Sequence, residues 1–399
     1  MPASSPAGEA LVALSAEFGR RLAAGAAARD LERRLPFQEI RDLAASGLLA
    51  ARVPAAYGGA EVTMTEFARI ILNLAKGDPN VAQAAGAVFP NVEKIRIYGS
   101  ERQQRKYFDL LLAGRRLSGN AAAERGGKRI GDMTTMVRRD GHGYRLSGRK
   151  YYTTGSLFAE YTLVTAHLEG GRRAAAVVPV DRPGVTILDD WDGMGQRTTA
   201  SGTAIFDDVR LDEDEVMVIP DYGRRRTYEG GFAQLLHAAL DAGIALAALD
   251  DAVAYGRTGA RPLPEAGVER AGDDPYVQHA VGEMAIRAHG AVALVERGAA
   301  FLDEAARAFH DRRPTADRLV GEASIAVAEA KFAASEASLR VSEMIYRIGG
   351  ASATARALNL DRHWRNARTH TTHDPAAYKA KAVGNFYLND VLPPINTKI

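Results

Sequence analysis

The hydrophobic pattern of this 399-residue chain changes its period twice, and no other feature of the sequence constrains the fold as strongly. Up to about residue 116, and again from about residue 225, apolar side chains recur at the three- and four-residue spacing of helices. Between these regions lie short β-branched or apolar runs, separated by turns rich in glycine and aspartate. The order predicts an α+β fold with three domains: an N-terminal helical domain (1–116), a central β-barrel (117–224) and a C-terminal four-helix bundle (225–399).

The middle region begins with the pattern of a β-hairpin. Asp140-Gly141 is a turn dipeptide, and its flanks within residues 137–148 alternate between apolar and polar side chains. Several short strands at close spacing favour a compact sheet or barrel of about 100 residues. Further strands are expected at residues 161–166, 174–180, 184–188 and 203–206.

The last part of the chain is helical again. Its helical segments are mostly long and mostly joined by short loops, so neighbours in the chain are expected to pack antiparallel as a bundle. The helices are expected at residues 232–255, 276–308, 317–348 and 354–368.

Composition excludes several classes of function. The net charge is +2, so no strong field favours nucleic acid or an anionic membrane as a partner. The chain has no cysteine, which excludes disulfides, thiolate catalysis and cysteine metal sites. No apolar run reaches about 18 residues, and the first ten residues lack the pattern of a signal peptide, so a cytoplasmic protein is the default expectation.

A polar segment near the C-terminus, residues 365–375, is the first candidate for chemistry. It contains His370, His373 and Asp374, and Pro375 after them can begin a helix but not continue one. The segment is therefore expected to be a polar corner between two helices that aims His373 into a cavity. A solvated, charged helix end is the alternative. A metal site is not expected, because the two histidines lack a third ligand at helical spacing.

Further motifs follow one another in a fixed order along the chain. They are Gly47-Leu48 with Tyr57-Gly58-Gly59, Gly119-Asn120-Ala121-Ala122-Ala123-Glu124, Gly148-Arg149-Lys150-Tyr151-Tyr152-Thr153-Thr154-Gly155, Phe206-Asp207-Asp208-Val209 and Arg347-Ile348-Gly349-Gly350. Together they resemble the acyl-CoA dehydrogenase superfamily over nearly the whole chain. The resemblance implies the same three domains, a flavin site and a homotetramer built by packing of the bundle helices.

The C-terminal motif departs from the dehydrogenases, which use a glutamate in this region to take the α-proton of an acyl thioester. Here the segment is His373-Asp374-Pro375, and Asp374 is the residue that would act as the base. With His363-Trp364-Arg365 before it, the segment resembles instead the branch of reduced-flavin-dependent monooxygenases, which includes dibenzothiophene monooxygenases and sulfur-acquisition oxidoreductases. That resemblance implies FMN, supplied as FMNH2 by a separate flavin reductase, with O2 and a small sulfur- or nitrogen-containing substrate.

The resemblance also gives roles to the corner histidines. An imidazole titrates near pH 6.5, so His373 suits the role of proton donor to a flavin C4a-hydroperoxide. His370 is expected beside it at the cofactor. Some members of the branch carry another histidine near residues 88–91, but residues 80–100 contain none here. This departure puts a second catalytic histidine in doubt and argues for a different substrate.

Three residues are candidates for contact with the flavin ring. Tyr152 and Thr154 are expected two apart on one face of a strand. The resemblance implies that the Thr154 hydroxyl reaches the ring in catalysis and that Tyr152 stacks beside it. Asn120 offers amide donors and an acceptor at the ring edge. Ordinary strand and turn roles are the alternatives.

Five other residues are candidates for the rest of the site. Arg261, in the loop between two bundle helices, would bind the FMN phosphate. Gly349 and Gly350 would let backbone approach the cofactor of a neighbouring subunit. Phe89 and Phe158 would be walls of the substrate pocket, although phenylalanine is more often core.

Two other functions stay open at this point. One is an FAD-dependent acyl-CoA dehydrogenase with Asp374 as its base. The other is a non-catalytic scaffold with a flavin-enzyme fold, whose polar corner serves only contacts between subunits.

Overall fold

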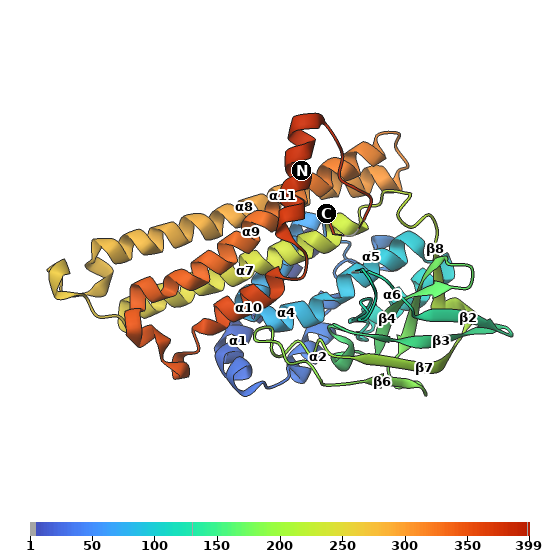
Figure 1. Ribbon diagram of the computed structural model, residues 1–399, viewed down its shortest axis with the longest axis horizontal. Coiled ribbons are helices and arrows are strands. Elements are labelled where there is room, and N and C mark those ends of the chain that lie inside the picture. The colour runs from blue at the N-terminus through green and yellow to red at the C-terminus, as the bar shows by residue number, and fades with distance from the viewer. Residues whose placement is uncertain (1–4, 130, 397) are drawn as a thin grey trace.

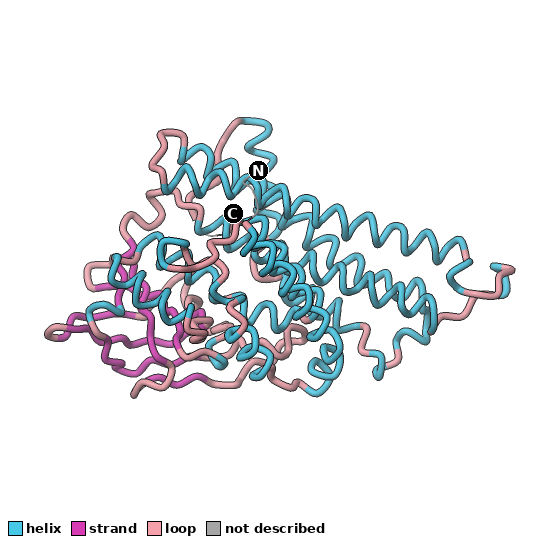
Figure 2. The backbone as a smooth tube through the Cα atoms, turned by 180° about the vertical axis from the view of Figure 1, so that it is seen from behind, coloured by secondary structure: helices cyan, strands magenta, loops and turns pink. Residues whose placement is uncertain are grey.

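The computed structural model describes residues 5–129, 131–396 and 398–399. Figure 1 shows the long C-terminal helices side by side on one side of the molecule and the strands on the other. Figure 2 shows the same separation from behind. The order of helices, strands and helices along the chain is therefore also a separation in space. The domain limits at residues 116 and 224 stay a prediction.

The N-terminal region is helical, as predicted. Two of its helices begin with capping boxes, in which Thr63 and Ser100 cap the helix and Glu66 and Gln103 bond back to the cap. Asp78 separates two of the helices: its backbone N–H donates to the Leu74 carbonyl at the end of one, and its side chain accepts from the Asn80 N–H at the start of the next. The helices are α1 (Pro6–Glu32), α2 (Phe37–Ala45), α3 (Met64–Gly77), α4 (Pro79–Gly86), α5 (Val88–Tyr98) and α6 (Glu101–Leu112).

The middle region forms one sheet. Neighbouring strands follow the order β6-β7-β3-β2-β4-β5-β8, and β1 pairs with β4. The order has two ends, and β6 does not pair with β8 in the described residues, so there the hydrogen bonds do not close the sheet into a ring. The strands are β1 (Gly119–Ala121), β2 (Met136–Asp140), β3 (Gly143–Lys150), β4 (Tyr161–Leu168), β5 (Arg173–Pro179), β6 (Val185–Ile187), β7 (Ala204–Leu211) and β8 (Val216–Ile219).

The C-terminal region is a bundle with one correction to the predicted helices. Residues 354–368 were expected to be one helix, but residues 350–358 form two 3-10 turns before the fourth helix begins. Asn359 causes this break, because its φ is 49° and its buried side chain donates to Asp30 on α1. The helices are α7 (Glu229–Thr258), α8 (Pro275–His310), α9 (Ala316–Gly349), α10 (Asp361–Thr371) and α11 (Ala376–Asn389).

Helix α7 lies at the centre of the helical layer. It packs against α3 and α4 on one side and against α8, α9 and α10 on the others. By length and composition it could cross a membrane, but 89% of its most apolar window is buried inside the protein. It is therefore the core helix of this fold, and the few polar side chains on it need partners.

Candidate active site

The predicted polar corner is present between α10 and α11. His370 lies in the last turn of α10 and is 4% exposed, whereas the His373 side chain is 50% exposed. Pro375 follows and is the N-cap residue of α11, as its fixed φ allows. The corner therefore presents one buried and one accessible imidazole.

One face of α7 supports this corner. Gln234, His237 and Asp241 are spaced three and four residues apart, so they lie on the same side of the helix. His237 Nδ1 is 3.0 Å from His370 Nε2, and its ring centroid is 4.2 Å from that of His373. Both corner histidines are thus held against a third histidine.

Asp241 anchors the buried side of this cluster. Its carboxylate is 0% exposed and accepts from Lys331 Nζ at 2.5 Å, His370 Nδ1 at 2.5 Å and Ser335 Oγ at 2.8 Å. Burial alone would raise the pKa of Asp241, but Lys331 and His370 lower it below the usual value. Burial lowers the pKa of His370, which Asp241 only partly offsets. The result is a buried carboxylate beside a neutral imidazole.

Asp374 orients the accessible histidine. Its Oδ2 atom is 2.9 Å from His373 Nδ1 and accepts from Gln234 Nε2 at 2.8 Å. Burial opposes its ionisation, but the hydrogen bond and charge of His373 and the bond from Gln234 lower the pKa of Asp374 to about 2. Because His373 Nδ1 is engaged, Nε2 is the ring nitrogen that remains for another partner.

Tyr152 and Thr154 follow the end of β3, and Asn120 lies on β1, but the strand predicted for Tyr152 and Thr154 is wrong. β3 ends at Lys150, and Tyr152 has a φ of 56°, so Tyr152 and Thr154 do not share a strand face. The Thr154 hydroxyl is 2.7 Å from that of Ser201, and the Asn120 N–H donates to the Thr154 carbonyl at 3.1 Å. Tyr152 is 50% exposed. These residues form a polar rim beside the half-exposed ring of Tyr152, which also contacts Trp191 and Arg125.

The loop of residues 195–201, before β7, connects this rim to α10, the helix that carries His370. The N–H of Gln196 donates to Asn366 Oδ1 on α10 at 2.7 Å, one helical turn before His370. A Cβ atom on Gly195 would meet the Arg365 carbonyl oxygen at 1.9 Å, so only glycine permits this approach. Ser201, at the other end of the loop, bonds Thr154.

The structure does not bring Arg261, Gly349 and Gly350 to this place within one chain. Arg261 is exposed in the loop after α7, which Figure 1 shows at the end of the bundle far from the sheet. Gly349 lies close to Tyr255 near the same end of α7. More than twenty residues of α7, about 30 Å of helix, separate this end from His237.

The two predicted wall residues lie in the core. Phe89 is 1% exposed and contacts Phe67, and Phe158 is 4% exposed and contacts Phe37, in both cases edge to face. These positions favour the structural role that was the alternative for each phenylalanine.

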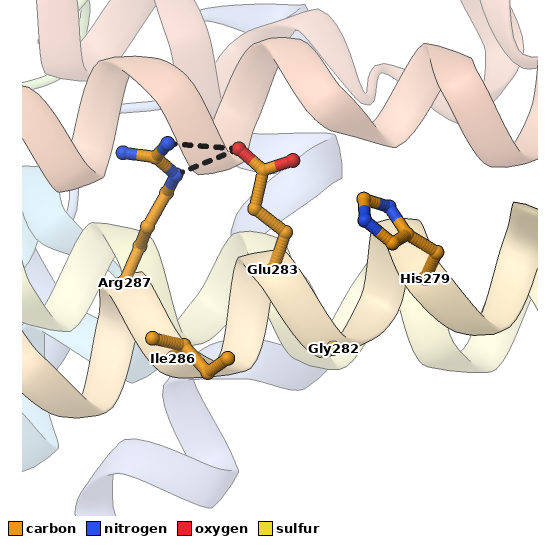
Figure 3. A pocket seen from close by; sticks show the side chains of 5 residues that line it. All are labelled: His279, Gly282, Glu283, Ile286 and Arg287. Atoms are coloured by element: carbon orange, nitrogen blue, oxygen red, sulfur yellow. Dashed lines mark hydrogen bonds and ion pairs between the residues drawn. The ribbon is translucent and has the colours of Figure 1, made fainter.

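One hollow on the surface lies in another part of the molecule. It is an open depression of about 650 Å³ along α8, lined by His279, Gly282, Glu283, Ile286 and Arg287. Figure 3 shows that these residues come from one helix and that Arg287 pairs with Glu283. A depression with a single helix as its wall has no convergent polar groups, so the histidine cluster stays the candidate site.

Three family models match the chain in the order of its regions. The acyl-CoA dehydrogenase N-terminal domain matches residues 7–115, the middle domain residues 121–209 and the C-terminal domain residues 235–377. The chain belongs to the acyl-CoA dehydrogenase family. The histidine corner, residues 370–374, lies at the end of the stretch that the C-terminal domain model matches.

Relatives within the acyl-CoA dehydrogenase family match nearly the whole chain. A dibenzothiophene monooxygenase of Rhodococcus qingshengii is 32% identical over 96% of this chain and 94% of its own. A probable FMNH2-dependent monooxygenase of Pseudomonas putida, SfnC, is 31% identical over 98% of both chains. The crystal structure of TdsC from Paenibacillus sp. A11-2 with FMN and indole has a TM-score of 0.91 and 29% identity, covering 98% of this chain and 99% of TdsC.

Four residues of the site were missed by the sequence analysis: Gln234, His237, Asp241 and Lys331. The first three are polar positions spaced three and four apart in an otherwise apolar helix, and that pattern was visible in the sequence. It marks a buried polar face that must meet another polar element. Lys331 gave no such signal, because α9 carries other charged residues that face solvent.

Proposed function

We propose that the chain is a two-component flavin-dependent monooxygenase that uses FMNH2 and O2 to oxygenate a small sulfur- or nitrogen-containing molecule. A separate reductase would supply FMNH2, and the enzyme would work as a cytoplasmic homotetramer. The similarity to dibenzothiophene monooxygenase and SfnC supports the reaction class. The observation that carries the proposal is the pairing of Asp374 with His373.

This pairing argues against the dehydrogenase alternative. A base that takes an α-proton works best with a pKa near the operating pH. Two hydrogen bonds and the nearby His373 hold the pKa of Asp374 at about 2. Asp374 is therefore a weak base that holds His373, and His373 Nε2 is the group that can carry a proton to a reacting atom.

The residues at the rim fit a flavin. The Asn120 side chain has no hydrogen-bond partner among the described residues, so its amide is available to a ring edge. The backbone N–H of Asn120 donates to the Thr154 carbonyl, and the half-exposed Tyr152 is two residues before Thr154 in the chain. Bound FMNH2 would supply the electrons that activate O2. Asn120, Tyr152 and Thr154 would hold the ring, and His370 and His373 would border it.

The rest of the cofactor site would come from a second copy. The loop that carries Arg261 and the end of α9 that carries Gly349 and Gly350 lie at the far end of the bundle, too distant to reach the rim of their own chain. A guanidinium in an exposed loop can bind a phosphate, and the two glycines allow close approach of backbone. A homotetramer with paired bundles would place this end at a neighbour's rim.

Supplying the purified protein with FMNH2, O2 and a panel of sulfides, amines, dibenzothiophene and indole tests the reaction class. The expected result is oxygenated product, with FMN bound loosely in the purified protein. Stoichiometric FAD and reduction of a dye by an acyl thioester would instead establish the dehydrogenase. Inertness in both assays would establish the scaffold.

Two substitutions test the role of the corner. His373→Ala should retain folding and FMN binding but lose product by about 10²- to 10⁴-fold, the usual effect of removing a positioned acid. Asp374→Asn should lose less, because the amide oxygen can still accept from His373 Nδ1. His279→Ala, on the outer face of α8, is the matched control and should behave as wild type. The reverse order of damage would assign Asp374 as the base.

Mixed oligomers test the composite site. Arg261→Ala and His373→Ala homotetramers should each be nearly inactive. If each site takes Arg261 from one copy and His373 from another, subunits mixed by refolding or co-expression regain activity, because some sites have both residues intact. Activity that stays at the level of the two parents would place both residues in the site of one chain and contradict the arrangement.

A further inference from the structure

Hydrogen bonds at the polar face of α7 run in one donor-to-acceptor direction, from His237 through His370 to Asp241. Asp241 is a carboxylate and only accepts, so His370 Nδ1 carries the proton of their 2.5 Å bond. Burial lowers the pKa of His370, which is therefore neutral near pH 7 and has a lone pair on Nε2. That lone pair accepts from His237 Nδ1 at 3.0 Å. One buried carboxylate thus sets the tautomers of two imidazoles in sequence.

His237 is neutral at the end of this chain of bonds. Burial is the main cause that lowers the pKa of His237 well below its usual value, and the nearby His373 adds to it. Its ring faces the His373 ring at 4.2 Å between centroids and 37° between planes. Two cationic rings at this separation would repel, so the pair carries at most one positive charge. The His373 side chain is 50% exposed, and its Nδ1 atom lies 2.9 Å from Asp374 Oδ2, so its Nε2 atom is the one that can meet a partner in the site.

We propose that His237 is a positioning residue: a neutral imidazole, locked by His370, whose ring face holds His373 in the orientation from which Nε2 donates its proton. The proposal rests on the proposed function for the role of His373, and it supplies the second histidine that residues 80–100 lack. Gln234 supports the same orientation from the other side, through Asp374. His237 itself acts through His373 and exchanges no proton with the substrate.

Two variants separate the ring of His237 from its hydrogen bond. His237→Phe keeps an aromatic face against His373 but leaves His370 Nε2 without its donor. His237→Asn keeps an N–H near the position of Nδ1 but removes the ring. The urea midpoint of unfolding should therefore fall further in His237→Phe, because a buried acceptor loses its partner.

Catalysis should show the opposite order. With FMNH2, O2 and a substrate that the wild type oxygenates, His237→Asn should lose about 10- to 100-fold in kcat, the usual effect of misplacing a catalytic group. Its KM should stay near that of the wild type, and consumed O2 should appear as hydrogen peroxide. His237→Phe should keep most of kcat and its coupling to product. A merely structural role would make activity follow stability and leave His237→Phe the worse variant.

A measurement on the cofactor-free protein makes the result independent of activity. Diethyl pyrocarbonate modifies accessible imidazoles, and peptide mass spectrometry follows His373 alone. Loss of the ring in His237→Asn should free His373 and raise its modification rate several-fold, while His237→Phe should match the wild type. Equal rates in the two variants, or a faster rate in His237→Phe, would overturn the proposal. A wild type without oxygenated product but with this modification pattern would refute the proposed function and leave the positioning role intact.

Discussion

Replacing Asp241 by asparagine tests whether one buried carboxylate holds the core of the site together. The change preserves the shape of the side chain and removes its charge. Lys331, which is 2% exposed, then loses its ion pair at 2.5 Å, and His370 loses the acceptor for Nδ1. Removing one partner of a buried ion pair typically costs about 3–5 kcal/mol, mainly because the other charge stays buried and unpaired. We expect Asp241→Asn to lose free energy of unfolding in this range.

A double-mutant cycle with Lys331→Met isolates the ion pair from other effects of the substitution. Urea unfolding at pH 7.5, followed by circular dichroism and by tryptophan fluorescence, gives the midpoint and slope for each of the four proteins. Contacting residues in a buried network usually couple by about 0.5–3 kcal/mol, and we expect the upper part of that range here. The double variant should therefore be more stable than the sum of the single losses predicts.

Two results would refute this reasoning. If Asp241→Asn loses less than about 1 kcal/mol, the pair is not the buried, unsolvated contact described above. If the two single losses add within about 0.5 kcal/mol, Asp241 and Lys331 do not act together. Asp311→Asn, which removes a carboxylate paired with Arg313 at the surface, is the control and should change stability little.

Two further predictions concern buried titratable groups. Burial lowers the pKa of Lys379 from 10.5 to about 8. Lys379→Met should therefore raise the free energy of unfolding at pH 7 by about 1–2 kcal/mol, after the loss of the hydrogen bond of Lys379, and this gain should shrink above pH 8. An unchanged or lower urea midpoint at pH 7 would contradict this prediction. Burial also lowers the pKa of His237, His363 and His370, so the unfolded chain binds more protons than the native protein as the pH falls below about 6.5. The urea midpoint should therefore decline between pH 6.5 and 5, before most carboxylates titrate, and a constant midpoint over this window would show that these histidines are not held neutral.

The layers of the fold were predictable because hydrophobic period is a local property of the chain. The β2–β3 hairpin at Asp140-Gly141 and the helix start after Pro375 both follow from a few neighbouring residues. The break before α10 was not predictable in this way. Asn359 lies outside the helix because its side chain donates a hydrogen bond to Asp30, more than 300 residues earlier in the chain.

The site was predictable only in part, for the same physical reason. His370, His373 and Asp374 are close in the sequence and could be recognised as a group. Their partners on α7 are more than 120 residues away, and their role depends on how α7 and α10 pack. Tyr152 was expected to share a strand face with Thr154, but β3 ends at Lys150 and Tyr152 takes a left-handed φ of 56°, which its neighbours in the sequence do not indicate.

The polar face of α7 also matters before the protein has folded. By length and composition alone, α7 meets the requirements of a helix that crosses a bilayer. Asp241 lies near the middle of the helix, where an aspartate costs about 2.5–3.5 kcal/mol on the scale measured for insertion by the translocon. Gln234 and His237 add further polar groups within two turns of it. The three side chains that support the histidine corner in the finished protein thus disfavour membrane insertion of the nascent helix, so a variant that makes this face apolar would risk mistargeting during synthesis as well as loss of the site.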